Sequence, residues 1–79
     1  METSLLDLHC GQKALIKRLN GGEEFRKKLA SLNIRVGKTV RKITQQPLQG
    51  PVVIEIDNTE ATIGMNMAKK IFLEPLEVE

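Results

Sequence analysis

At 79 residues the chain has room for one domain with a small core, because a chain of this size buries only about 60% of the surface that its unfolded form exposes. Hydrophobic residues make up 41% and charged residues 28%, which excludes a disordered chain and predicts one folded domain over residues 1–79. The net charge of +2 is too small to indicate a nucleic-acid-binding protein by itself.

The first third of the chain is predicted to form a strand followed by a helix. The strand covers residues 12–19, where apolar residues alternate with lysines, as in a half-buried strand. The helix covers residues 23–32 and ends at Asn33, because asparagine tolerates the left-handed backbone of a helix C-terminus. Its apolar stripe, at i, i+4 and i+7, consists of Phe25, Leu29 and Leu32.

A second strand is predicted over residues 39–45, after a turn at Gly37. Val40 and Ile43 are an odd number of residues apart, so they cannot share one face of a strand without a bulge. The register of this strand therefore stays open. A loop with two prolines and a glycine follows over residues 46–51.

The last third is predicted to form a hairpin, a short helical turn and a closing strand. Residues 52–56 and 59–63 alternate in polarity on either side of a two-residue Asp-Asn turn, which is the pattern of a hairpin. The helical turn covers residues 64–70. The closing strand covers residues 71–74 and is stopped by Pro75.

Five short strands around one small core predict a closed barrel, because closure removes the exposed edges of an open sheet. The fold class is therefore mainly β: a five-stranded barrel with one α-helix inserted after the first strand and a short helical turn before the last strand. The predicted core consists of Ile16, Phe25, Leu29, Leu32, Val40, Ile54, Ile56, Ile63, Ile71 and Leu73.

A set of positions spread over nearly the whole chain carries a resemblance to a known family. They are Leu8, Gly11, Leu29, Leu32, Asn33, Ile34, Gly37, Val40, Pro47, Gly50, Pro51, Val53, Ala68 and Ile71. In this order, the residues and elements resemble the FeoA (ferrous iron transport protein A) family, which implies an SH3-like fold. Three positions differ from the usual family pattern: Asn33 replaces a glycine, Val36 a proline and Gly64 an arginine.

The resemblance implies a small cytosolic accessory protein of bacterial ferrous iron uptake. The implied partner is FeoB, a membrane permease that carries a cytoplasmic GTPase domain, so contact with the membrane is indirect. A second copy of the chain is another expected partner. Similar domains also end metal-dependent repressors, but no helix-turn-helix pattern precedes the predicted barrel, which disfavours that interpretation.

Two features that core formation does not explain are the candidate docking surface. The helix carries a basic face that would steer a partner, and the loop over residues 46–51 holds an apolar leucine between turn residues. The two methionines of the helical turn are expected to pack inside, with an adaptable binding surface as the alternative. The candidate partner-binding residues are Arg26, Lys27, Lys28, Pro47, Leu48, Pro51, Met65 and Met67.

Neither a metal site nor catalysis is predicted. His9 and Cys10, with Asp7 nearby, supply too few ligands for a four-ligand structural site, although two copies of the chain could share a metal ion. Nucleophilic catalysis would have to rely on that single histidine. The glycine pair at residues 21–22 precedes two glutamates, which would repel phosphate. We expect no cofactor and no enzymatic activity.

Nucleic-acid binding is the alternative function, because the middle third of the chain is basic and small barrels often bind RNA or single-stranded DNA. Such proteins usually stack bases on aromatic side chains. Phe25 and Phe72 are the only aromatic residues here, and both are predicted to lie inside. We therefore expect no nucleic-acid partner.

Cysteine usage and hydropathy indicate the cytoplasm. Cys10 is the only cysteine, so no internal disulfide can form, which agrees with a reducing compartment. No apolar run reaches the about 18 residues that would span a bilayer. Residues 1–7 also lack the basic start and the long apolar stretch of a signal peptide.

Overall fold

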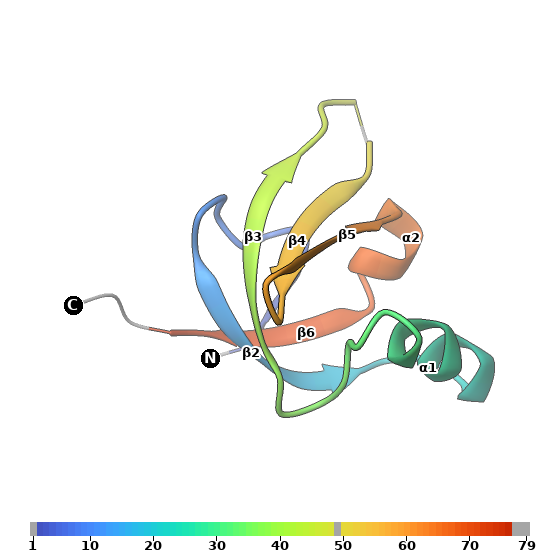
Figure 1. Ribbon diagram of the computed structural model, residues 1–79. Coiled ribbons are helices and arrows are strands. Elements are labelled where there is room, and N and C mark those ends of the chain that lie inside the picture. Colours follow the sequence, from blue (N-terminus) through green and yellow to red (C-terminus); the bar gives the residue numbers. More distant parts are fainter. Residues whose placement is uncertain (1, 49, 77–79) are drawn as a thin grey trace.

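One antiparallel sheet of six strands forms the body of the computed structural model, which describes residues 2–48 and 50–76. Along the chain the elements are β1 (Thr3–Ser4), β2 (Lys13–Leu19), α1 (Glu23–Ala30), β3 (Thr39–Gln45), β4 (Val52–Ile56), β5 (Thr59–Ile63), α2 (Met65–Ala68) and β6 (Ile71–Pro75). In the sheet the strand order is β1-β6-β2-β3-β4-β5. The sheet curls around a single core, and both helices lie toward the same side of it (Figure 1).

The predicted mainly β, SH3-like fold is confirmed, with one strand more than the sequence predicted. The additional strand, β1, pairs with β6 through Thr3 opposite Leu73 and Ser4 opposite Phe72. Two residues are too few to show a polarity period, so the pattern could not reveal this strand. Its pairing leads the chain into the interior, where Leu5 is fully buried.

The core is built from aliphatic side chains of every strand longer than two residues and of both helices. Eight predicted core residues are buried: Ile16, Leu29, Val40, Ile54, Ile56, Ile63, Ile71 and Leu73. Seven further apolar residues join them: Leu5, Leu8, Ala14, Leu19, Ile34, Val52 and Ala68. Phe25 is half-buried and packs against this cluster.

The prediction that Leu32 belongs to the core is wrong, because α1 ends at Ala30 and the stripe does not continue. Asn33 takes the left-handed conformation that the sequence predicted, with φ of 67°. The Ile34 amide then donates to the Leu29 carbonyl at 2.9 Å, which is the closing bond of a Schellman-type helix end. This turn buries Ile34 and leaves 37% of Leu32 exposed.

The open register of β3 is resolved by a bulge against β4 between Lys42 and Thr44. Val40 points inward with 2% exposure, whereas Ile43 is 36% exposed. The inward neighbour of Val40 on β3 is Lys42, which is only 1% exposed. A lysine thus occupies an interior position that a hydrophobic pattern would not assign to it.

The Lys42 ammonium group holds the first turn of the chain against β3. Its Nζ donates to the carbonyl oxygens of Leu5 at 3.0 Å, Leu6 at 2.9 Å and Leu8 at 2.7 Å. It also donates to Oε1 of Gln45 at 2.6 Å. These oxygens replace the water that a buried ammonium group loses. Burial lowers the pKa of Lys42, and electrostatic interactions with Cys10 and Asp7 oppose that shift.

The hairpin and the last elements follow the sequence closely. Asp57 and Asn58 have φ of 52° and 64°, as a two-residue type I′ turn between β4 and β5 requires. The helical turn is shorter than predicted and forms α2. The closing strand β6 extends through Pro75, which lies opposite Ala14 as the last residue of the strand. Among the residues described, no helix has the length and apolarity to cross a membrane.

Candidate functional site

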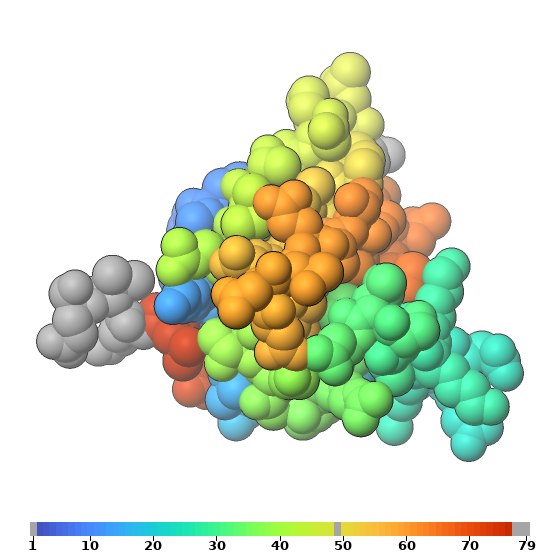
Figure 2. All heavy atoms as spheres, in the orientation of Figure 1, coloured from blue at the N-terminus to red at the C-terminus, as the bar shows by residue number. Residues whose placement is uncertain are grey.

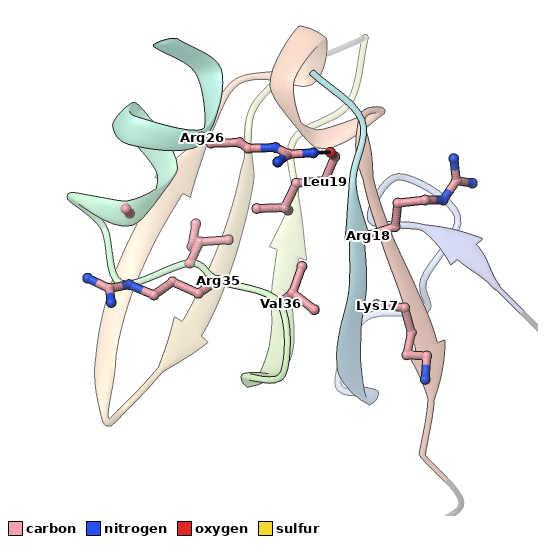
Figure 3. Close-up of a pocket in the computed structure, with 8 residues that line it drawn as sticks. Lys17, Arg18, Leu19, Arg26, Arg35 and Val36 are labelled. Carbon is pink, nitrogen blue, oxygen red and sulfur yellow. Dashed lines mark hydrogen bonds between the residues drawn. The ribbon is translucent and has the colours of Figure 1, made fainter. Parts of the chain in front are cut away.

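A groove of ≈ 520 Å³ lies between α1, the end of β2 and the segment that connects α1 to β3 (Figure 3). We call it the basic groove. It is lined by Lys17, Arg18, Leu19, Arg26, Ala30, Ile34, Arg35 and Val36. Its volume lies within the range of about 300–1,000 Å³ that is usual for ligand pockets.

The centre of the basic groove is aliphatic. Leu19 and Ile34 are buried beneath it, and Ala30 of α1 is half-buried. Val36 lies between the two sides of the groove and exposes 61% of its surface (Figure 3). Val36 precedes Gly37, whose φ of 96° bends the chain toward β3 and holds the valine at the surface. Val36 thus gives the groove an accessible apolar centre.

Three cationic side chains surround this centre. The guanidinium of Arg26 extends across the groove and donates to the Leu19 carbonyl at 3.4 Å (Figure 3). Lys17 on β2 and Arg35 on the connecting segment lie on opposite sides of Val36 (Figure 3). None of the three takes part in an ion pair among the described residues, and no acidic side chain belongs to the lining.

Arg18 belongs to the lining but turns away from the groove (Figure 3). Its guanidinium pairs with Glu2 at 3.1 Å and lies 4.4 Å from the centre of the Phe72 ring. Its charge is therefore already partnered at the N-terminal side of the molecule. The positive potential of the groove comes from Lys17, Arg26 and Arg35.

The three residues of the predicted basic helix face do not all point to the same part of the surface. Arg26, Lys27 and Lys28 are all exposed on α1. Only Arg26 lines the basic groove. The two lysines remain on the outer part of the helix, where they are accessible to a partner.

The predicted docking loop projects from the opposite part of the molecule. Leu48 is 98% exposed, at φ of 58°, between the exposed Pro47 and Pro51. Gln49, within the same loop, lies outside the described residues. The loop between β3 and β4 and the helix α1 form separate projections (Figures 1 and 2). The structure therefore does not join the loop and the basic helix face into one patch.

The methionines of α2 are half-buried. Met67 packs against the core, as the sequence analysis expected, and Met65 is also only partly exposed. Their helix lies between the β3–β4 loop and α1 in Figure 1. A partner that touched both predicted surfaces would have to pass over it.

His9 and Cys10 are both exposed, near the first turn of the chain. Among the residues that the structure describes, no group of three histidine, cysteine, aspartate or glutamate side chains is placed to hold a metal ion.

Thermal unfolding is therefore expected to be the same with and without EDTA, because the described core needs no metal ion to close it. The measurement is a melting curve at micromolar concentrations, where a dimer would not form. A large fall in melting temperature in EDTA would show that ligands had been missed.

The sequence analysis missed most of the groove. Lys17, Leu19, Ile34, Arg35 and Val36 were not among the predicted site residues. A local signal existed only at Arg35 and Val36, where a charged and an aliphatic residue precede the Gly37 turn. The rest of the groove depends on how β2 and α1 pack, which no local pattern shows.

The sequence matches the FeoA domain family over residues 3–75. A relative in Methanocaldococcus jannaschii that bears the name Fe(2+) transport protein A is 30% identical over 67 residues, which is 85% of this chain and 79% of that protein. An Fe(2+) transport protein A/Fe(2+) transporter FeoB fusion protein of Porphyromonas gingivalis is 33% identical over 70 residues. That stretch is 89% of this chain but 8% of the fusion protein.

Among solved structures, the crystal structure of an iron uptake regulatory protein (FeoA) is similar, with a TM-score of 0.87 and 25% sequence identity. The match covers 96% of this chain and 99% of that chain. The likeness therefore extends over the whole sheet and both helices.

Proposed function

This chain belongs to the FeoA family of ferrous iron transport accessory proteins, and we propose that it acts by binding the cytoplasmic GTPase domain of an FeoB-type permease. The proposed activity is binding and not catalysis. On this proposal the chain works in the cytoplasm, and it meets the membrane only through the permease.

The observation that carries this proposal is the fusion protein of Porphyromonas gingivalis, whose name joins transport protein A and the transporter FeoB in one polypeptide. Covalent linkage keeps two domains at a high effective concentration. Such linkage favours contact between two domains that would otherwise associate by diffusion. We infer that this chain makes the corresponding contact with an FeoB-type permease.

The exposed surface of the chain suits a weak, transient contact. Leu48 offers an apolar tip on a rigid sheet, and such tips are frequent docking points. Lys27 and Lys28 offer charge on α1, which raises the rate of encounter with an acidic partner. Because the loop and the helix are separate projections, we expect each to contribute independently to binding.

We expect the isotope-labelled chain to show saturable amide shifts when the isolated GTPase domain of the permease is added. Leu48→Asp should weaken binding at all salt concentrations, because it removes apolar contact. Lys27→Glu/Lys28→Glu should weaken binding mainly at low salt, because screening already limits exposed charges at physiological ionic strength. Each variant is first checked for a folded amide spectrum.

The matched control is Lys13→Glu/Arg41→Glu, which changes the net charge equally at two exposed sites on β2 and β3, outside the proposed surface. A short RNA tests the nucleic-acid alternative in the same titration. If Leu48→Asp and the helix variant both bind as the parent does, the surface named here is wrong. If the parent does not bind the GTPase domain at all, the proposed function is wrong.

A further inference from the structure

We propose that the basic groove binds an acidic, extended peptide segment of a partner protein, with an aliphatic side chain of that segment seated on Val36. The inference deepens the proposed function and rests on it in one respect, namely that this chain acts by binding proteins. It concerns a surface distinct from Leu48 and from the outer lysines of α1.

The apolar centre of the groove favours an aliphatic side chain on the ligand. Val36 exposes 61% of its surface above the buried Leu19 and Ile34. A side chain such as leucine would cover Val36 and remove apolar surface from water on both partners. No aromatic side chain belongs to the lining, so the described groove has no platform for stacking a nucleic-acid base.

The cations around the centre call for carboxylates. Lys17 and Arg35 lie on opposite sides of Val36, so acidic residues on either side of a seated aliphatic group would each approach one positive charge (Figure 3). Arg26 spans the groove, and the only described hydrogen bond of its side chain is long, at 3.4 Å to the Leu19 carbonyl. Its guanidinium could exchange that weak contact for a bidentate contact with a carboxylate.

The unpaired edge of β2 favours a ligand with an extended backbone. β2 pairs with β6 through Leu19, but with β3 only from Lys13 to Leu15. On the β3 side, the Ile16 amide donates to the Lys38 carbonyl and the Ile16 carbonyl accepts from the Gly37 amide, so one further residue of β2 is paired. Beyond that point the connecting segment leaves β2, and among the described strands none pairs with residues 17–19 on that side. An extended peptide can lie along such an edge.

A flat ligand surface, such as a lipid bilayer, cannot contact both the apolar centre and the cations of the groove. The groove is concave, and its apolar centre lies between a helix and a strand (Figure 3). A protruding strand-like segment can reach that centre, whereas a bilayer would contact only the cations at the rim. The described geometry therefore favours a peptide over a lipid surface.

The test uses three acetylated and amidated peptides, titrated into the isotope-labelled full chain. The probe is GEELEEG, which carries a leucine between glutamates. GEEAEEG removes the aliphatic anchor, and GQQLQQG removes the charges. We expect the probe to shift the amides of residues 17–19 and 34–36 saturably, and to bind at least about tenfold more tightly than either control.

Two groove variants and one control variant make the test specific to this surface. Lys17→Glu/Arg35→Glu should weaken binding of the probe by about tenfold or more. Val36→Asp should weaken it by a similar factor, although both cations stay in place. Lys13→Glu/Arg41→Glu changes the net charge equally at two exposed sites outside the groove, so it should bind the probe within about twofold of the parent. Arg18 and Arg26 are left unchanged because both contact other parts of the fold.

Several results would overturn the proposal. They are shifts that map elsewhere, equal binding of the three peptides, or equal binding by the parent and both groove variants. Tighter groove-dependent binding of a short RNA, or of vesicles of phosphatidylglycerol and phosphatidylcholine, would also overturn it in favour of another class of ligand. Binding of the probe without binding of the GTPase domain would refute the proposed function alone. Binding of the GTPase domain without binding of the probe would refute the proposed peptide site in the groove alone.

Discussion

Lys42→Met is expected to lower the free energy of unfolding by about 3 kcal/mol, because it leaves two buried carbonyl groups and one partly buried carbonyl group without this donor, and a buried unpaired group costs about 1–3 kcal/mol. The carbonyls of Leu5 and Leu8 are buried and that of Leu6 is partly buried, and the amide oxygen of Gln45 loses the same partner. Methionine fills a similar volume, so the expected cost comes from polar groups and not from a cavity. In a domain of this size, that cost is a large share of the total stability.

Urea unfolding measures this loss, and Lys13→Met is the matched control. Lys13 carries the same side chain on the neighbouring strand β2 but is exposed, so its replacement should change the free energy of unfolding by less than about 0.5 kcal/mol. Hydrogen exchange adds a local measurement. The Leu5 amide, which donates to the Ile71 carbonyl at 2.9 Å, should lose protection in Lys42→Met. A Lys42→Met variant as stable as Lys13→Met would show that the ammonium group does not hold the first turn.

Leu29→Ala is expected to cost about 2–5 kcal/mol, because it opens a cavity where α1 meets the sheet. Leu29 is fully buried, and its carbonyl also accepts the bond from Ile34 that ends the helix. The same truncation at Leu32, three residues later, should cost less than about 1 kcal/mol, because that side chain is 37% exposed. The pair therefore tests the structure of the helix end directly.

The measurement is again urea unfolding, with the dependence of the free energy on denaturant concentration compared between variants. If Leu29→Ala and Leu32→Ala lowered the free energy of unfolding equally, the result would support the longer helix with one continuous stripe that the sequence predicted. A loss below about half a kilocalorie per mole for Leu29→Ala would mean that the helix does not pack on the sheet.

The fold has a consequence for the basic groove. Lys42 keeps the first turn in place, and β1 then lies beside β6 with Glu2 close enough to pair with Arg18. That ion pair draws Arg18 away from the groove and leaves Val36 accessible between Lys17 and Arg35 (Figure 3). The orientation of Arg18 is thus fixed by contacts with Glu2 and Phe72, outside the groove.

The sequence by itself determined the elements whose signals are local. Alternating polarity identified β2, β4 and β5, because neighbouring side chains of a strand point to opposite faces. The Asp57-Asn58 turn and the left-handed Asn33 followed from side chains that tolerate positive φ. The exposed leucine of the β3–β4 loop was also predictable, because prolines on either side of Leu48 exclude a regular element.

Only the tertiary structure decided the features that depend on residues far apart in the chain. A two-residue strand has no period, so β1 exists only because β6 is there to pair with it. A lysine is predicted to lie at the surface, and Lys42 is buried because three carbonyls more than thirty residues away surround its ammonium group. The basic groove arises in the same way. Its cations come from β2, α1 and the connecting segment, and they meet around Val36 only because α1 ends early and buries Ile34 in place of Leu32. Local propensity carries no information about such long-range contacts, because each of them depends on a partner that only the folded chain supplies.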